Sequence, residues 1–120
     1  MTTITREILE LAALAAGRSH YRYCELWGAM AAYSDADGFY GPAWRPHADL
    51  GDTARLAVNM GIVSNPGRDD EPVEAWRSAW DASDRQRIRH DGTEPGRQIA
   101  WCTAVTLVAA AIGRRMKEQQ

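Results

Sequence analysis

The chain is 120 residues long, 45% of them hydrophobic, and its formal net charge at neutral pH is only −2. This length and apolar content predict one domain, residues 1–120, that buries a core of its own. A charge so close to zero excludes proteins that bind nucleic acid or acidic membranes through bulk positive charge. The apolar runs are also shorter than a membrane span, so we expect a soluble, cytoplasmic protein with no membrane partner.

The first element expected is a helix over residues 5–16. Apolar residues recur at helical spacing from Ile8 to Ala15, and Thr3 or Thr5 can cap the start. The apolar face of this helix is rich in alanine. We therefore expect it to pack closely against another helix, with the last helix of the chain as the best candidate.

Residues 19–27 are predicted to form a strand, because Tyr21 and Tyr23 alternate with polar neighbours. Residues 28–33 are ambiguous between an extended continuation and a single helical turn, since they are alanine-rich but few. Residues 34–38 have the composition of a turn or an exposed loop. Their acid spacing is that of part of a calcium loop, but the later glutamate of such loops is missing, so no metal is expected.

The most specific local pattern is a proline-braced turn at residues 41–46. Pro42 and Pro46 favour extended backbone at the residues before them, and so they hold Trp44 in a stiff, non-helical segment. We expect Trp44 to cover the hydrophobic core. The alternative is that it is an exposed recognition anchor.

A capped helix is predicted to follow this turn, beginning near Leu50 and ending at Gly61. Asp49 can accept hydrogen bonds from the first free backbone N–H groups of the helix. Asp52, three residues on, can reach back to it as an acidic variant of a capping box. The polar residues here are interpreted as structural rather than catalytic. The structural motif comprises Trp44, Pro46, Asp49, Asp52 and Arg55.

A short strand at residues 62–63 and an acidic loop precede two further predicted strands, residues 73–80 and residues 85–90. The first of the two alternates in polarity and carries Trp76 and Trp80 on one face. A helix over the same eight residues is the main competing interpretation, because the proline before them suits a first helical position.

Arg85, Arg87 and Arg89 fall on one face of the second strand, because side chains alternate along a strand. Three arginines on an exposed face could bind phosphate groups or an acidic protein. The alternative is that the arginines are only solvent-exposed charges, because a charged outer strand also prevents edge-to-edge aggregation. This alternative stays open. Together with Trp76 and Trp80, the arginines form the candidate binding surface for a protein or a nucleic acid, since aromatic residues and arginine are typical interface anchors.

The last helix is expected to open at Thr93, with Pro95 in its first turn, where proline is tolerated. An apolar stripe then runs along it through Ile99, Val105 and Ile112. Arginine and lysine follow at its C-terminal end, where positive charge suits the helix dipole. As the most hydrophobic helix, it is predicted to form the centre of the fold.

Charge is distributed unevenly along the chain. Residues 1–84 carry 7 basic and 13 acidic side chains, and residues 85–120 carry 7 basic and 3 acidic ones, which gives −6 against +4. The fold could separate the two sets into a bipolar surface or bring them together in mutual neutralisation. Both alternatives stay open.

No motif for catalysis or for a cofactor is present: there is no phosphate-binding glycine loop, nucleotide fingerprint or nucleophile elbow. Cys24 and Cys102 lie in apolar or aromatic runs and are expected to be buried free thiols. His20, His47 and His90 lie in separate segments without the spacing of a zinc site. We therefore expect no metal, no cofactor and no enzymatic activity. A small hydrolase or metal enzyme is kept as the last alternative.

Three segments carry a resemblance to a known group of proteins. The chain has Leu-Glu-Leu-Ala-Ala at residues 9–13, Ile-Gly-Arg at residues 112–114, and in the middle Trp44-x-Pro46-x-x-Asp49-x-Gly51-Asp52-x-x-Arg55-Leu56-Ala57-Val58. In these features it resembles small accessory proteins encoded by tailed bacteriophages and prophages, and it is loosely similar to the NinX-like phage proteins. Arg45 stands where the group usually has asparagine. The resemblance implies an origin and no activity.

The sequence as a whole predicts an α+β fold in which three helices pack on a small, mostly antiparallel sheet. For function it favours a non-enzymatic, phage-encoded accessory protein that binds a host macromolecule, with a host protein preferred, in the cytoplasm of the infected bacterium. Interference with a host defence system such as CRISPR is one concrete version. Nucleic-acid binding through the strand of Arg85, Arg87 and Arg89 is the first alternative. A homo-oligomer is compatible with the five tryptophans.

Overall fold

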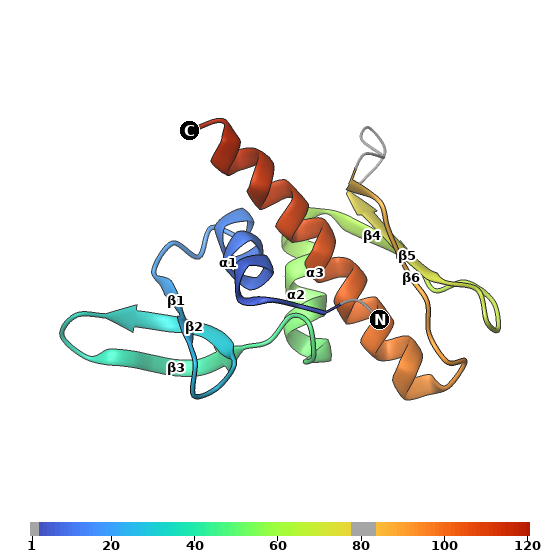
Figure 1. Ribbon diagram of the computed structural model, residues 1–120, viewed down its shortest axis with the longest axis horizontal. Coiled ribbons are helices and arrows are strands. Elements are labelled where there is room, and N and C mark those ends of the chain that lie inside the picture. Colours follow the sequence, from blue (N-terminus) through green and yellow to red (C-terminus); the bar gives the residue numbers. More distant parts are fainter. Residues whose placement is uncertain (1–2, 78–83) are drawn as a thin grey trace.

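The computed structural model describes residues 3–77 and 84–120, which fold into three helices and two antiparallel sheets (Figure 1). The Cα radius of gyration is 14.3 Å, near the value of about 13.6 Å for a compact chain of this length. The α+β prediction is thus confirmed, with the strands divided between two sheets. The elements are α1 (Arg6–Ala15), β1 (Tyr21–Cys24), β2 (Ala29–Ser34), β3 (Gly38–Trp44), α2 (Leu50–Met60), β4 (Ile62–Asn65), β5 (Val73–Arg77), β6 (Gln86–Ile88) and α3 (Glu94–Glu118).

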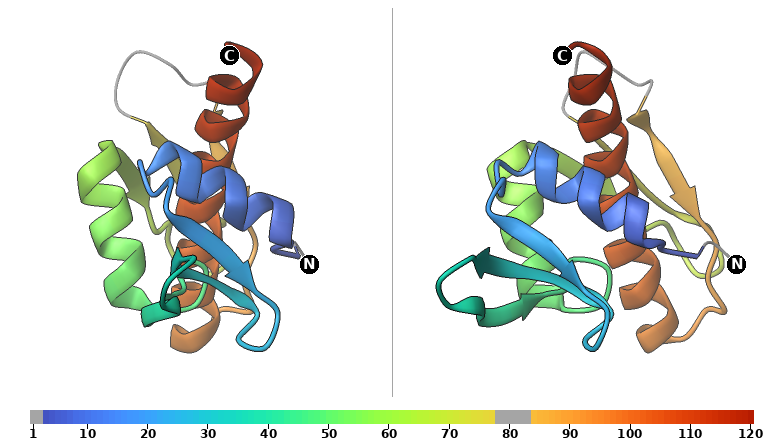
Figure 2. Two further views of the ribbon diagram at one scale, coloured as in Figure 1. Left: turned by 90° about the vertical axis from the view of Figure 1, so that its left-hand side faces the viewer. Right: turned by 60° about the vertical axis from the view of Figure 1, so that its left-hand side comes forward.

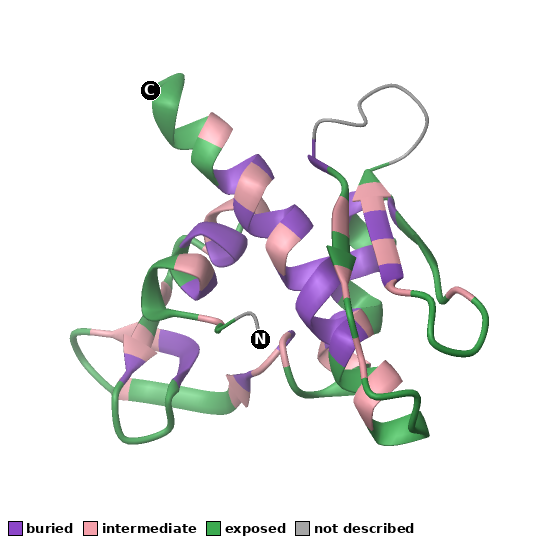
Figure 3. Ribbon diagram, turned by 45° about the vertical axis from the view of Figure 1, so that its right-hand side comes forward, coloured by how far each residue is buried: buried purple, intermediate pink, exposed green. Residues whose placement is uncertain are grey.

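Helix α3 is the centre of the fold, as its apolar content predicts. The β4–β6 sheet, α1 and α2 all pack on α3, and the β1–β3 sheet packs on α1, so the two sheets lie on opposite sides of the molecule (Figures 1 and 2). Figure 3 shows buried residues along the middle of α3 and along β5. By length and composition α3 could cross a membrane, but 61% of its most apolar 18-residue window is buried within this fold, as in the core helix of a globular protein.

Helices α1 and α3 approach each other closely, as the alanine-rich face of α1 predicts. Thr5 caps α1 by accepting a hydrogen bond from the Ile8 N–H at 3.2 Å. Where the two helices meet, Gly113 lies against the backbone of α1. A Cβ atom on Gly113 would lie 2.0 Å from the Leu11 carbonyl oxygen. Only glycine fits at this point of contact.

The first sheet consists of two successive antiparallel hairpins, β1–β2 and β2–β3. The ambiguous residues 28–33 are therefore mainly strand, since β2 covers most of them. The proline-braced segment is extended as predicted, and its residues 41–44 form the end of strand β3. Gly41 has a positive φ of 75°, and the register shifts in the facing strand between Met30 and Ala32.

Trp44 ends β3 with only 4% of its surface exposed, which confirms that it covers the core. Asp49 caps α2 as predicted, since its carboxylate accepts the Asp52 N–H at 2.9 Å. The predicted capping box does not form. Asp52 instead accepts hydrogen bonds from the Arg45 N–H at 2.9 Å and the Arg55 guanidinium at 2.7 Å. The N–H of Asp49 is already bonded to the Arg45 carbonyl, so Asp52 ties the end of β3 to α2.

Thr53 is a buried threonine that joins this connection to α2. Its hydroxyl lies 2.5 Å from the Pro46 carbonyl oxygen and 2.8 Å from the Asp49 carbonyl oxygen, and no described backbone N–H donates to the Pro46 oxygen. We expect Thr53→Val to lower the free energy of unfolding by about 1–2 kcal/mol, because that oxygen would stay buried without a partner. Thr106→Val is the control, because Thr106 bonds the Cys102 carbonyl inside α3. Equal losses in urea unfolding would contradict the assignment.

His47 lies half-buried in the connection between β3 and α2, and its Nδ1 has no hydrogen-bond partner among the described residues. Burial lowers the pKa of His47 below its usual 6.5, and the nearby positive charge of Arg45 lowers it further. The folded protein therefore binds this proton less readily than the unfolded chain does. The free energy of unfolding should fall as pH drops below about 6.5. Urea unfolding at several pH values should show a smaller fall in stability for His47→Gln and an unchanged fall for the control His20→Gln. If the fall is unchanged in His47→Gln, groups other than His47 cause it.

The second sheet has the order β4-β5-β6, which confirms the strand interpretation for residues 73–77. Val73 and Ala75 are completely buried on the face toward α3, whereas Glu74 and Trp76 on the other face are half-buried. Strand β6 is shorter than the prediction of residues 85–90. Residues 78–80 of the other predicted strand, and with them Trp80, lie outside the described residues.

Candidate functional site

Arg85 and Arg87 lie on the outer face of the second sheet and reach back over β5. Both guanidinium groups pair with Glu74, which is the register partner of Arg87, at N–O distances of 2.8 and 3.0 Å. The guanidinium of Arg85 also lies over the Trp76 ring, 4.5 Å from its centroid. The structure therefore brings together three of the predicted binding residues, Trp76, Arg85 and Arg87. The charges of the two arginines are already paired with Glu74 within the sheet.

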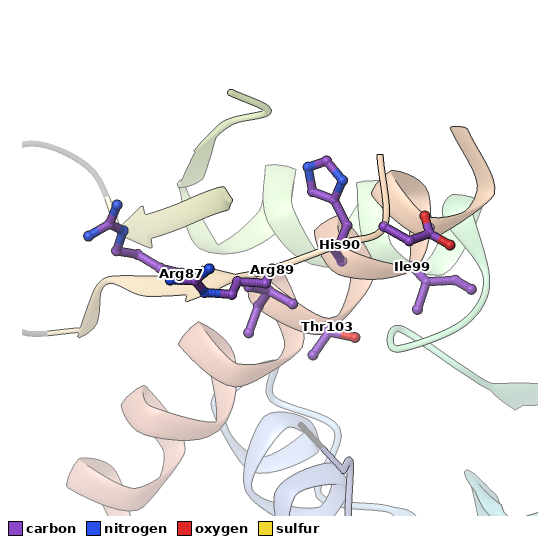
Figure 4. A pocket seen from close by; sticks show the side chains of 9 residues that line it. Arg87, Arg89, His90, Ile99 and Thr103 are labelled. Carbon is purple, nitrogen blue, oxygen red and sulfur yellow. The ribbon is translucent and has the colours of Figure 1, made fainter. Parts of the chain in front are cut away.

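Arg89 is placed differently from the other two arginines. It follows β6 and makes no ion pair or hydrogen bond with any other described residue. Its side chain lines a groove of about 540 Å³ between the β6 segment and the first half of α3 (Figure 4). The strand side of this groove consists of Arg87, Ile88, Arg89, His90 and Asp91, and the helix side consists of Gly96, Ile99, Ala100 and Thr103.

The five residues on the strand side of the groove are consecutive in the chain. Successive side chains of an extended segment point to opposite faces, so a groove lined by all five lies along the edge of the segment. On its other side β6 pairs with β5, and no described strand pairs with the edge that faces the groove. The groove therefore combines the unpaired backbone groups of an edge strand with the side chains of α3.

The strand side of the groove carries charges of both signs. Arg87, paired with Glu74, stands at the start of the segment, Arg89 in its middle and Asp91 at its end. Hydrogen bonds from the hydroxyl and the N–H of Thr93, at 2.5 and 2.9 Å, lower the pKa of the Asp91 carboxyl group and favour its ionised form. His90 lies between, with both ring nitrogens hydrogen-bonded to backbone groups. A ligand along this edge would meet the positive charge of Arg89 at the middle of the segment and the negative charge of Asp91 at one end.

The helix side of the groove is mostly apolar. Ile99 is 60% exposed here, and the buried residues Ala100 and Thr103 lie beside it (Figure 4). The sequence pattern groups Ile99 with the apolar stripe of the helix, so sequence reasoning did not identify it as a site residue. No sequence pattern signals this exposure, because it depends on which parts of the 25-residue helix the other elements cover.

The uneven charge distribution of the sequence is neutralised in part by ion pairs in the fold. Arg114 pairs with Glu7, and Arg115 pairs with the buried Asp84. The β6 arginines pair in the same way with an acid from the earlier part of the chain. Four basic side chains of residues 85–120 thus meet acidic side chains of residues 1–84, which supports mutual neutralisation for these pairs. Of the two arginines that line the groove, Arg87 is paired and Arg89 has no ion pair with any described residue.

The candidates for metal binding and covalent chemistry do not converge. Cys24 and Cys102 are buried free thiols, as expected. Burial raises the pKa of the Cys102 thiol, which favours its protonated and less nucleophilic form. Within residues 3–77 and 84–120, no three His, Cys, Asp or Glu side chains are grouped as they would be around a metal ion.

No protein-family model, curated protein or solved structure matches the chain. What the groove can bind is therefore inferred from its own residues and geometry. It offers an unpaired strand edge, an apolar helix wall and the exposed cation of Arg89.

Proposed function

We propose that the chain is a non-enzymatic, phage-encoded accessory protein that binds a host protein in the bacterial cytoplasm, and that the groove between β6 and α3 is its binding site. The observation that carries the proposal is the groove, where an exposed apolar side chain lies beside an unpaired strand edge. Exposed apolar surface with a charged rim is typical of protein interaction sites. Interference with a host defence system is the concrete version that the phage-like patterning favours.

The proposal is tested by photo-crosslinking inside the bacterial host. A photo-reactive amino acid replaces Ile99 in the groove in one variant, and Val58 on α2 in the other. Val58 is the matched control because it is also aliphatic, helical and exposed, at 81% against 60% for Ile99, and it lies outside the groove. We expect one discrete adduct with a host protein at position 99 and none at position 58.

Adducts of equal yield at both positions, or none at position 99, would refute the groove as the site. Turnover of a small molecule by the purified protein would refute the non-enzymatic part of the proposal. Metal analysis of the same preparation tests the remaining alternative of a small metal enzyme or hydrolase.

Nucleic-acid binding is the second candidate function and has weaker support in the geometry. Arg85 and Arg87 already share Glu74, so much of their charge is unavailable to phosphate groups. We expect no retardation of duplex or single-stranded DNA in a gel shift at low salt. Retardation that weakens steeply with added salt would instead favour this candidate.

A further inference from the structure

We propose that the groove binds an extended acidic segment of the partner as an additional strand on the free edge of β6. This inference rests on the proposed function and specifies the chemistry of what the groove binds. The bound segment would carry a carboxylate beside Arg89 and an aliphatic side chain against Ile99. It would be held mainly by backbone hydrogen bonds to the unpaired edge.

The edge of β6 is accessible because its charged side chains do not cover it. The guanidinium groups of Arg85 and Arg87 pair with Glu74 on β5, so these two charges are directed over the sheet, although Arg87 also contributes to the lining of the groove. Strand β3, one of the two edge strands of the other sheet, is different. It contains Gly41 with a φ of 75° and then Pro42, which has no N–H to donate, and such irregularities block strand addition.

The lining of the groove specifies the chemistry of the added strand. Five consecutive residues on the strand side span about 17 Å, enough for an equal number of partner residues. Every second partner side chain would face α3, where Ile99 provides apolar contact. Arg89, the middle residue of the five, has no ion pair among the described residues and favours a carboxylate opposite it. The ionised Asp91 disfavours one at its end of the groove.

Charge also argues against a second copy of this chain as the added strand. Antiparallel pairing of two β6 strands about a two-fold axis at Arg87 would place Arg87 opposite its own copy and Arg85 opposite Arg89. An axis at Ile88 would place Arg87 opposite Arg89. Like charges directly opposite each other destabilise strand pairing, so an acidic strand from a different protein fits this edge better.

The first test is an unbiased selection of displayed peptides of about 12 residues, long enough to cover the groove, on the immobilised full-length protein. We expect enrichment of sequences that combine one or two acidic residues with β-branched aliphatic residues at alternate positions. Binding of these peptides should be lost in Ile99→Asp and retained in Val58→Asp. Selection of basic peptides, of peptides with helical spacing, or of none that depends on Ile99 would overturn the proposal.

The second test asks whether backbone hydrogen bonds hold the peptide. The enriched peptide is synthesised with a single N-methyl group at each amide in turn, which removes one N–H donor at a time. Methylation at alternate positions should weaken binding by about tenfold or more, and methylation at the positions between them should change it by less than about threefold. Uniform effects along the peptide would rule out strand addition.

The third test concerns charge. Arg89→Glu should weaken binding of the enriched peptide by about tenfold, since it replaces an attraction by a repulsion. Arg22→Glu, at an exposed position of strand β1 in the other sheet, should leave binding within about twofold. Equal effects of the two variants would overturn the assigned polarity. Dissociation of a dimer by Ile99→Asp in sedimentation would identify a second copy as the occupant and also overturn the proposal.

The results distinguish this inference from the proposed function. A host protein crosslinked at position 99, together with a uniform N-methyl profile, would support the function and refute strand addition. An alternating N-methyl profile without any host adduct would support strand addition and refute the function.

Discussion

Gly113→Ala should destabilise the protein by about 3 kcal/mol or more and lower the melting temperature by roughly 10 °C. Helix propensity predicts the opposite sign, since alanine is favoured over glycine by about 1 kcal/mol inside a helix. The contact with α1 outweighs this preference, because the added Cβ would lie 2.0 Å from the carbonyl oxygen of Leu11. That atom belongs to the backbone and cannot move away unless the two helices separate.

The control for this prediction is Gly51→Ala in the first turn of α2. A Cβ atom there would approach only side-chain atoms of Asp49 and Arg55, at 3.1 Å or more, so the change in the free energy of unfolding should stay within about 1 kcal/mol. Both variants are compared by denaturant unfolding. A stabilised Gly113→Ala protein would show that α1 and α3 do not pack as described.

Arg115→Ala should be the next most destabilising change, lowering the free energy of unfolding by about 2 kcal/mol. Arg115 pairs with Asp84, whose side chain is only 4% exposed. Removing the arginine leaves a buried carboxylate without this partner, and such changes cost about 3–5 kcal/mol in fully buried pairs. The Arg115 side chain is itself 40% exposed, so water screens part of the effect.

The neighbouring arginine provides the control for this experiment. Arg114 pairs with Glu7, but both side chains are more than half exposed, so Arg114→Ala should cost less than about 0.5 kcal/mol. Arg115→Lys should recover part of the loss, because it keeps the positive charge. Equal effects of Arg114→Ala and Arg115→Ala would show that burial of Asp84 does not determine the strength of the pair.

Local signals were sufficient to predict the helices. Thr5, Asp49 and Thr93 each cap the helix that the sequence assigns to them, because a cap and an apolar repeat are both read within a few residues. The first sheet was less predictable. An alanine-rich segment has no strand propensity of its own, and β2 is a strand because it pairs with β1 and β3 on its two sides. Asp52 likewise bonds to Arg45 because of a turn whose geometry no sequence pattern specifies.

The candidate site was predictable only in part. The alternation of Arg85, Arg87 and Arg89 indicated an exposed strand correctly for β6, but the pairing of two of them with Glu74 depends on the register of β5 and β6. The groove depends on how far α3 extends beyond the helices packed on it, and this is a property of the assembled fold. For that reason Ile99 was interpreted as part of the apolar stripe although it is exposed.

The position of α3 in the chain also affects how the protein folds during synthesis. The contact between Leu11 and Gly113 joins residues about 100 positions apart, and closing so long a loop slows folding. Until α3 has left the ribosome, α1 and the β4–β6 sheet lack the surface on which they pack. The nascent chain therefore exposes the apolar faces of these elements to chaperones and to other chains until the last helix is made.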